Sequence, residues 1–176
     1  MPLRRLAMLI AIIIAAVVLS MGVFATYTII NNFVFDVNKE YSDVTLDPSL
    51  YDLKDAITEL YCLPPEIGCE YIDDINDGEV AFYNYSLNNN TVGLIQYTKV
   101  FAVQSLRVNT ENADVFGIKI NGNDGFMVIQ HYEGFDDSKT ITWVMDGYIF
   151  QITSAAISND DLMKLAESVI MKEKLE

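Results

Sequence analysis

The stretch Thr140-Ile141-Thr142-Trp143-Val144-Met145-Asp146-Gly147-Tyr148-Ile149-Phe150-Gln151-Ile152-Thr153 decides the fold. Its Asp-Gly pair is typical of a two-residue hairpin turn, because a type I′ turn needs positive φ at both central residues. A loop at Asp146 and Gly147 sets Trp143 opposite Phe150 and fixes which residues share a face. One face then carries the large apolar side chains Ile141, Trp143, Met145, Tyr148, Phe150 and Ile152, and the other carries Thr140, Thr142, Gln151 and Thr153.

A helix is expected directly after this hairpin, and it would cover the apolar face. Ser158 is placed as the N-cap, and Asp161 stands three residues later, where it closes a capping box. Apolar residues then recur at helical spacing up to Ile170: Leu162, Leu165, Ala166, Val169 and Ile170. The unit from Lys139 to Ile170 is therefore predicted to be two strands, a tight turn and a closing helix.

The N-terminal 30 residues carry the strongest signal outside this unit. Residues 6–30 contain no charged side chain, and a transmembrane helix needs only about 20 apolar residues, so this run is predicted to be a membrane anchor. Residues 1–5 then form a cytoplasmic tip. The alternative is a cleaved signal peptide, because Val23-Phe24-Ala25 has the small-residue spacing of a cleavage site near Ala25. Apolar residues continue past that site, which favours the uncleaved anchor.

Charge predicts the orientation. Arg4 and Arg5 precede the apolar run, and residues 31–176 hold nine Lys and Arg against 25 acidic residues, a net charge of −16. The positive-inside bias keeps the arginines in the cytoplasm and leaves the acidic remainder outside, at the cell membrane. An acidic domain repels the phosphates of DNA and RNA, so no nucleic-acid partner is expected.

The two cysteines, Cys62 and Cys69, are separated by six residues. In an oxidising compartment such a pair most simply forms a disulfide that closes a small loop. A redox motif has two intervening residues and a metal site has more ligands, so both of those readings are poorer.

The apolar run is followed by a predicted polar stalk over residues 31–47 and an extracytoplasmic domain over residues 48–176. Asp47-Pro48 reads as the N-cap and first residue of a helix. The apolar stripe of that helix is expected at Leu50, Leu53, Ile57 and Leu60, with an end before Pro64.

The segment from Glu66 to Glu79 carries six carboxylates and no basic residue. Calcium is the specific hypothesis, with Asp73 and Asp77 as weak candidate ligands, because hard cations take oxygen ligands. Ile75 stands where an EF-hand needs a ligand, however, and this favours a solvated acidic loop.

Strand patterns follow at residues 80–86, 92–103, 115–120 and 126–132, before the hairpin. The connections are short, which predicts a curved antiparallel sheet of about six strands. With a helix on each side of this series, the predicted class is α+β. Asn84-Tyr85-Ser86 and Asn89-Asn90-Thr91 are glycosylation sequons, so Asn84 and Asn89 are candidate acceptors, although chance explains such short patterns almost as well.

Catalytic constellations are missing from the sequence. His131 is the only histidine, no glycine pattern of a nucleophile elbow surrounds a serine, and paired carboxylates occur only in the acidic segment. His131 could act as a general base only with a placed partner. No cofactor and no enzymatic activity are expected, with an extracytoplasmic hydrolase as the alternative.

Three stretches together resemble a known family. They are Ile120-Asn121-Gly122-Asn123-Asp124-Gly125-Phe126, the hairpin with its Thr142-Trp143 pair, and the helix sequence Leu162-Met163-Lys164-Leu165-Ala166-Glu167-Ser168-Val169. Domains of unknown function at the C-terminal end of membrane-anchored bacterial and archaeal envelope proteins have this pattern. The hairpin and helix also resemble the C-terminal element of periplasmic sigma-factor regulators of the RseB (MucB) type and of lipoprotein-sorting proteins. The resemblance covers about residues 115–171 and carries no catalytic residue.

Two functions are compatible with these features. The first is a non-catalytic module at the cell envelope that binds a protein or regulates one. The second, which the resemblance to the sorting proteins implies, is a half-barrel that binds a lipid or lipopeptide under the helix. An open apolar cavity larger than about 300 Å³ favours the second function, and a filled core removes it.

Overall fold

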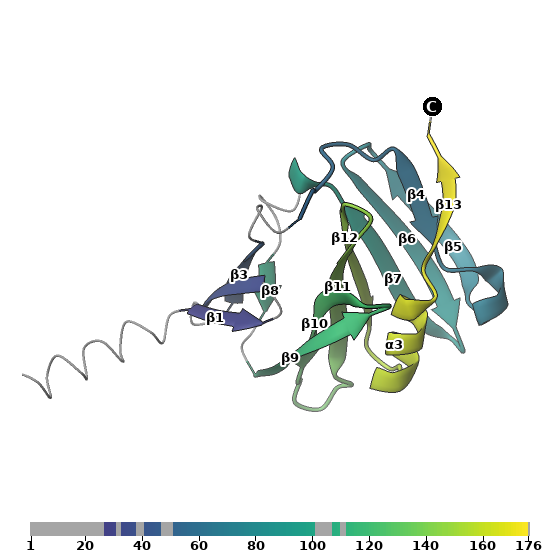
Figure 1. Ribbon diagram of the computed structural model, residues 1–176. Coiled ribbons are helices and arrows are strands. Elements are labelled where there is room, and N and C mark those ends of the chain that lie inside the picture. The colour runs from purple at the N-terminus through teal and green to yellow at the C-terminus, as the bar shows by residue number, and fades with distance from the viewer. Residues whose placement is uncertain are drawn as a thin grey trace, which may run out of the picture.

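The computed structural model describes residues 27–30, 33–37, 41–46, 51–100, 107–109 and 112–175. These residues form a large antiparallel sheet with a layer packed on each of its two faces (Figure 1). The predicted α+β class was wrong, because the described part of the chain is mostly β-strand and contains only one complete α-helix.

The large sheet has seven strands in the order β5-β6-β7-β12-β11-β10-β9. In chain order they are β5 (Glu70–Asn76), β6 (Val80–Leu87), β7 (Asn90–Tyr97), β9 (Ala113–Ile120), β10 (Asn123–Gln130), β11 (Ser138–Met145) and β12 (Tyr148–Ser154). The hairpin β11–β12 lies at the centre, with two further strands beyond it on one side and three on the other. Every neighbouring pair is antiparallel; the short connections predict this for the consecutive strands but not for β7 and β12, which are far apart in the chain.

The predicted register of the central hairpin is confirmed. Trp143 pairs with Phe150 and Met145 with Tyr148, and the turn residues Asp146 and Gly147 have φ values of 52° and 80°. Positive φ at both positions is what a type I′ turn demands. The hairpin therefore sends Trp143 and Phe150 to one face, which we call the helix face, while the pair Val144 and Ile149 lies on the opposite face.

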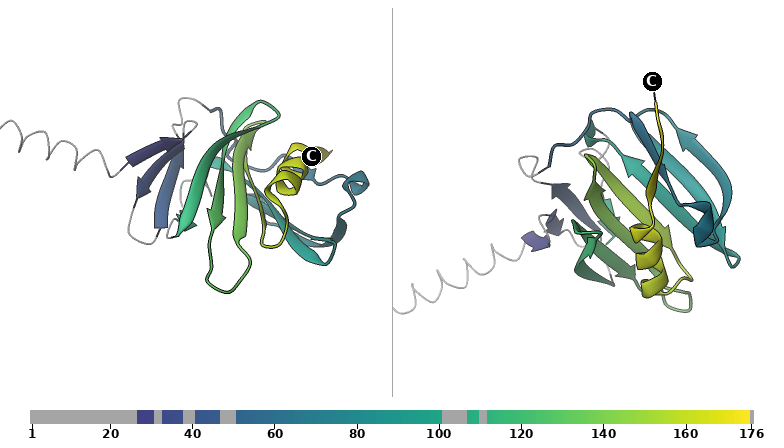
Figure 2. Two further views of the ribbon diagram at one scale, coloured as in Figure 1. Left: turned by 90° about the horizontal axis from the view of Figure 1, so that it is seen from below. Right: turned by 45° about the vertical axis from the view of Figure 1, so that its right-hand side comes forward.

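The helix face is covered by α3 (Asn159–Glu167), which lies across it (Figure 2). Ser158 caps this helix as predicted: its hydroxyl oxygen accepts a hydrogen bond of 3.1 Å from the backbone N–H of Asp161. The helix ends earlier than its apolar pattern indicates. Ile170 belongs to a strand instead and is half exposed. Its helical spacing from the preceding apolar residues therefore does not correspond to a position on the helix.

Two short strands cover the rest of the helix face. They are β4 (Glu59–Cys62) and β13 (Ile170–Lys174), which pair with each other and with no other described strand. Together with α3 they enclose one hydrophobic core, in which Trp143, Phe150 and Leu162 are fully buried.

The opposite face of the sheet is covered by a second, smaller sheet (Figure 2). Its strands are β1 (Tyr27–Ile30), β2 (Phe33–Val37), β3 (Tyr41–Leu46) and β8 (Arg107–Asn109), in the order β1-β2-β3-β8. The rings of Phe33 and Phe35 meet the Phe126 ring edge to face, with centroids 4.8 and 5.0 Å apart. This is a second core, separate from the one under α3.

The predicted helix before Pro64 was wrong. Leu60 lies in β4, and residues 51–58 run without helical structure; Leu50 lies outside the described residues. The backbone of this segment bonds to other elements, since Lys54 N donates to Gly147 O at 2.9 Å and Ile57 N donates to Gly78 O at 2.8 Å. Those bonds replace the ones a helix would make within itself.

Predictions for the N-terminal region need correction where the structure describes it. Most of the predicted anchor at residues 6–30 lies outside the described residues, but Tyr27–Ile30 form β1 and extend no helix. The described residues contain no helix that is long and apolar enough to cross a membrane. The region assigned to an irregular stalk contains β2 and β3, whose residues Phe33, Phe35 and Val44 belong to the second core.

The side chain of Trp143 needs a glycine beside it. Gly125 of β10 pairs with Trp143, and a Cβ atom on Gly125 would lie 2.6 Å from the carbonyl oxygen of Thr142 and 2.9 Å from Trp143 Cβ. Both contacts are shorter than van der Waals distance, and the atoms belong to a buried strand that cannot move away freely. Gly125 therefore lets the indole lie against the sheet.

We predict that Gly125→Ala lowers the free energy of unfolding by about 1–3 kcal/mol, the usual effect of overpacking a core. Gly93→Ala is the matched control, because its Cβ would meet only side-chain carbons, at 3.3 Å. Urea denaturation followed by Trp143 fluorescence measures both variants. Equal stability of the two variants would contradict the role given to Gly125.

Candidate functional site

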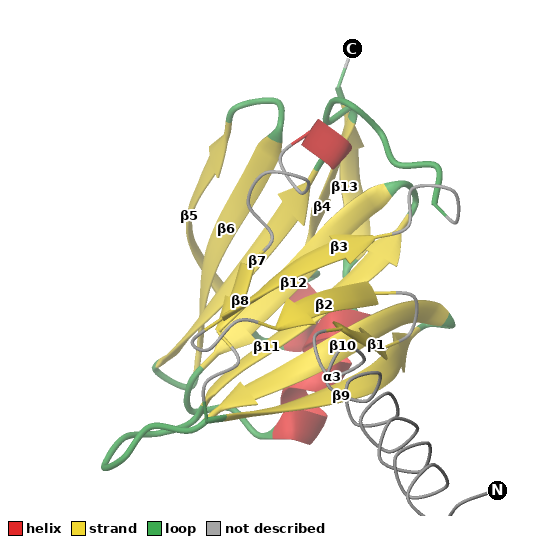
Figure 3. Ribbon diagram, turned by 90° about the vertical axis from the view of Figure 1, so that its left-hand side faces the viewer, coloured by secondary structure: helices red, strands yellow, loops and turns green. Residues whose placement is uncertain are grey.

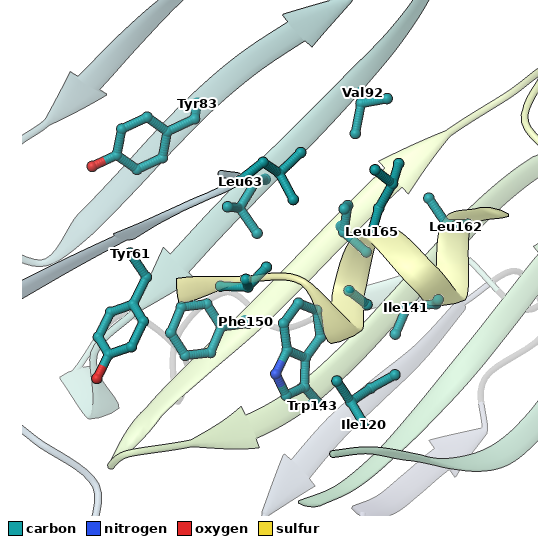
Figure 4. Packing of buried hydrophobic residues seen from close by; sticks show 14 of the residues in the cluster. Tyr61, Leu63, Tyr83, Val92, Ile120, Ile141, Trp143, Phe150, Leu162 and Leu165 are labelled. Carbon is teal, nitrogen blue, oxygen red and sulfur yellow. The ribbon is translucent and has the colours of Figure 1, made fainter. Parts of the chain in front are cut away.

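The helix face of the large sheet is filled and leaves no room under α3. Trp143 stacks on Phe150 with centroids 5.3 Å apart and an interplanar angle of 22°, and Leu162 and Leu165 of α3 belong to the same hydrophobic cluster (Figure 4). All four side chains are at most 2% exposed. The space that a lipid-binding half-barrel keeps open is occupied by the protein's own side chains.

Strand β4 closes the same face through hydrogen bonds from buried side chains. Gln96 of β7 is fully buried; its Nε2 donates to Glu59 O at 2.7 Å and its Oε1 accepts from Tyr61 N at 3.2 Å. Next to it, the hydroxyl of Tyr85 accepts from Leu63 N at 3.1 Å. Side chains of the large sheet thus supply, along one edge of β4, hydrogen bonds of the kind that a neighbouring strand would supply.

The start of β4 is held by the tyrosine after the hairpin turn. The Tyr148 hydroxyl accepts hydrogen bonds from Thr58 N at 3.0 Å and from Glu59 N at 3.3 Å. From the other side, the Tyr61 hydroxyl donates to Asp146 Oδ2 at 2.9 Å, and burial followed by this bond raises the pKa of Tyr61. The turn that organises the hairpin also anchors the strand that covers it.

An open depression of about 380 Å³ lies beside that turn and is bordered by Tyr51, Asp52, residues 122–124 and residues 144–147. Three carboxylates line it, Asp52, Asp124 and Asp146, and the last two have partners in the structure. Asp146 accepts from Tyr61, and Asp124 forms an ion pair with Lys119 at 2.6 Å.

The predicted acidic loop is an edge strand. Glu70–Asn76 forms β5, the last strand of the seven, and all seven of its residues are exposed. Figure 3 shows β5 at the rim of the sheet, with no described strand beyond it. The segment before it contains the short 3-10 helix η1 (Pro65–Ile67).

The two calcium candidates make hydrogen bonds within the protein. Asp73 accepts from Asn84 Nδ2 at 2.6 Å, and Asp77 accepts from the backbone N–H groups of Glu79 at 3.0 Å and Val80 at 2.9 Å. The bonds from Val80 and then Glu79 lower the pKa of Asp77. Among the described residues no group of three or more His, Cys, Asp or Glu side chains is arranged to hold a metal ion.

Strand β5 also exposes large apolar side chains, which sequence reasoning missed. Tyr71 is 51%, Ile72 55% and Ile75 68% exposed. Exposed apolar residues on an unpaired sheet edge are a recognised site of strand pairing, which proteins usually blunt. The sequence of β5 shows no regular alternation of apolar and polar residues, because Tyr71 and Ile72 are adjacent and so are Asp73 and Asp74.

His131 directly follows β10 and is placed between two carboxylates at the surface. Its Nε2 lies 3.2 Å from Asp114 Oδ2, and its Nδ1 lies 3.1 Å from Asp137 Oδ2. The contacts with Asp114 and then Asp137 raise the pKa of His131. Both ring nitrogens face a carboxylate oxygen. The ring borders an open depression of about 540 Å³.

The two cysteines lie at the ends of the segment between β4 and β5. Cys62 is the last residue of β4, Cys69 directly precedes β5, and both are half-buried free thiols in the structure. Burial raises the pKa of both thiols, with Lys172 opposing this effect at Cys62. The disulfide between them stays a prediction.

The two glycosylation candidates differ in their surroundings. Asn84 is a half-buried residue of β6, and its amide donates to Asp73. Asn89 is exposed in the β6–β7 turn, where its φ of 66° is typical of Asn in a tight turn. Asn89 is thus the better placed acceptor, and glycosylation of either residue stays a prediction.

Comparison with protein families finds one match. The family described as "Domain of unknown function (DUF4367)" matches residues 58–169, which covers β4, the whole seven-stranded sheet and α3. The match begins well before residue 115, so it includes the segment between Cys62 and Cys69. No curated protein and no solved structure matches the chain, and the resemblance to sigma-factor regulators finds no support here.

The His131 contacts generate a pH prediction. The ionic hydrogen bonds to Asp114 and Asp137 raise the folded-state pKa above the unfolded value, so their stabilisation is complete below the unfolded pKa and is lost as pH rises through the folded pKa. NMR titration of this single histidine should give a midpoint above about 6.5. Asp114→Asn should lower the midpoint, and its stability deficit should shrink between about pH 5 and about pH 8.

An unchanged midpoint in Asp114→Asn would contradict this geometry. Asp160→Asn serves as the control, because Asp160 lies on α3 and makes no contact with His131 in the structure.

A second prediction concerns the cysteines. Mass spectrometry of non-reduced protein from an oxidising compartment should find a peptide pair joined through Cys62 and Cys69. Reduction should then lower the melting temperature, because a disulfide constrains the unfolded chain. Two alkylatable thiols in the exported protein would show the prediction to be wrong.

Proposed function

The chain belongs to the family described as Domain of unknown function (DUF4367), and for this member we propose a non-catalytic binding role at the cell envelope. The partner is a protein, which docks at the surface rather than inside the domain. No step of catalysis is assigned to any residue.

One observation carries the proposal: each face of the large sheet carries a hydrophobic core closed by the protein's own chain, while the edge strand β5 is exposed along its full length. A filled interior offers no cavity for a small ligand, and for this reason we do not propose lipid binding. An exposed strand edge with apolar side chains offers backbone and side-chain contacts to another polypeptide.

Charge supports a protein partner over a nucleic acid. The chain carries a net charge of −14, and the segment that includes β5 holds six carboxylates without a basic residue. Phosphate groups are repelled by such a surface, whereas protein segments come with either sign of charge.

We propose that the β domain lies outside the cytoplasm. Support comes from the sequence: Arg4 and Arg5 precede an uncharged apolar stretch, and every acidic residue follows it. In this proposal the apolar stretch before β1 keeps the protein at the membrane, or cleavage near Ala25 releases it. Alkaline phosphatase fused after Glu176 should be active, and an inactive fusion that is present in normal amount would place the domain in the cytoplasm.

Site-specific photo-crosslinking in the source cells tests the binding role. A photo-reactive amino acid is placed in the full-length protein at Ile75 on β5, at Tyr132 beside His131, or at Asn159 on α3, all of which are exposed or at the surface. We expect a discrete adduct with one protein at Ile75 and none at Asn159. The absence of any adduct from the first two positions, or turnover of a substrate in a hydrolase screen, would contradict the proposed function.

A further inference from the structure

The backbone of β5 is half unpaired. Asp77 N donates to Val80 O at 3.2 Å and closes the β5–β6 hairpin. Hydrogen-bonded and non-bonded pairs alternate from that point along an antiparallel ladder, so Ile75 bonds to Phe82, whereas Asp74 and Asn76 direct their backbone groups away from β6. These outward groups form a short template for one more strand.

The two faces of β5 differ in chemistry. Ile75 lies on the same face as Phe82 and Ile95, which the register places next to each other on β6 and β7, and it ends this apolar row at the rim. Asp74 points to the helix face, where its carboxylate accepts a hydrogen bond from the Tyr71 hydroxyl. An added strand therefore meets an apolar side chain on one face and a carboxylate on the other.

Charge decides which strand fits. An antiparallel pair of two β5 copies centred near Asp73 and Asp74 would bring the carboxylates of the two copies together, and like charges across a strand pair are destabilising. An incoming strand with Lys or Arg on the helix-face side would instead attract the carboxylates of β5. Lys or Pro on an edge strand hinders pairing with another strand, but β5 contains neither residue.

We propose that β5 binds an extended segment of a partner protein in which basic and apolar residues alternate, and that this segment becomes an eighth strand of the sheet. The inference rests on the proposed function and names the chemistry of its partner. Apolar residues of the segment pack beside Ile75, basic residues pair with Asp74, and backbone hydrogen bonds form at Asp74 and Asn76.

The test uses the full-length protein in detergent and two capped peptides of about ten residues, one alternating Lys with Val and the other alternating Glu with Val. Amide hydrogen exchange is measured by NMR. With the Lys-Val peptide we expect at least about tenfold slower exchange at Asp74 and Asn76, an effect that weakens as salt is added. The amide of Ile75, already bonded to β6, should change little.

A matched pair of variants separates charge from backbone pairing. Asp74→Ser and Asp74→Pro both remove the carboxylate, but only proline removes the outward N–H. We expect Asp74→Pro to bind the Lys-Val peptide at least about tenfold more weakly than Asp74→Ser does. Fluorescence of the buried Trp143 checks that both variants fold. If Asp74→Pro does not fold, a Lys-Val peptide with methylated backbone nitrogens at alternate residues replaces it, and binding to the wild-type protein should be lost.

The outcomes distinguish this inference from the proposed function. Equal binding of the two peptides, no binding of the Lys-Val peptide, or unchanged exchange at Asp74 and Asn76 overturns the added strand. If the Ile75 crosslink in cells persists in that case, the binding role stands with a different mode of contact. If the Lys-Val peptide slows amide exchange at Asp74 and Asn76 but no crosslink forms in cells, the peptide pairing at β5 is supported and the proposed function is overturned.

Discussion

Strand β4 has a partner strand along only one of its edges, and the structure depends on how its other edge is satisfied. A buried backbone N–H or C=O without a partner costs about 1–3 kcal/mol, so a lone strand edge cannot simply be laid on an apolar sheet. Gln96 and Tyr85 supply the missing bonds from within the sheet, and Tyr148 supplies them at the start of the strand. With β4 held in this way, β13 can pair with it, and the helix face is closed by these strands and α3 together.

Closure of the helix face determines where function can lie. Trp143 and Phe150 belong to the core between the large sheet and the elements that cover its helix face. Phe126 belongs to the core between the large sheet and the smaller sheet on the opposite face. Binding inside either layer would require one of these cores to open. The rim of the sheet requires no such change, because β5 already exposes its outer backbone groups together with Ile75. In our proposal, the acidic residues of β5 favour a basic partner segment.

Local signals in the sequence predicted what local interactions decide. Asp146-Gly147 determined the hairpin register, and Ser158 determined the start of α3, because turn and cap chemistry act within a few residues. The apolar stripe through Leu53, Ile57 and Leu60 wrongly predicted a helix. Leu53 packs against the second core, whereas Ile57 and Leu60 belong to the first. Strand β5 escaped detection because a fully exposed edge strand shows no alternation of apolar and polar residues. Gln96 could not be recognised either, since its role depends on a strand 35 residues away.

The central claim is that β4 is fixed to the sheet by these side chains and keeps the helix face closed. Amide hydrogen exchange of Tyr61 and Leu63 tests it most directly, because their N–H groups donate to the side chains of Gln96 and Tyr85. We predict that the amides of Tyr61 and Leu63 exchange as slowly as those of the central strands β11 and β12, which exchange only on global unfolding. Exchange at the rate of an unprotected peptide would show that β4 lifts from the sheet, and the helix face would then be an accessible binding surface.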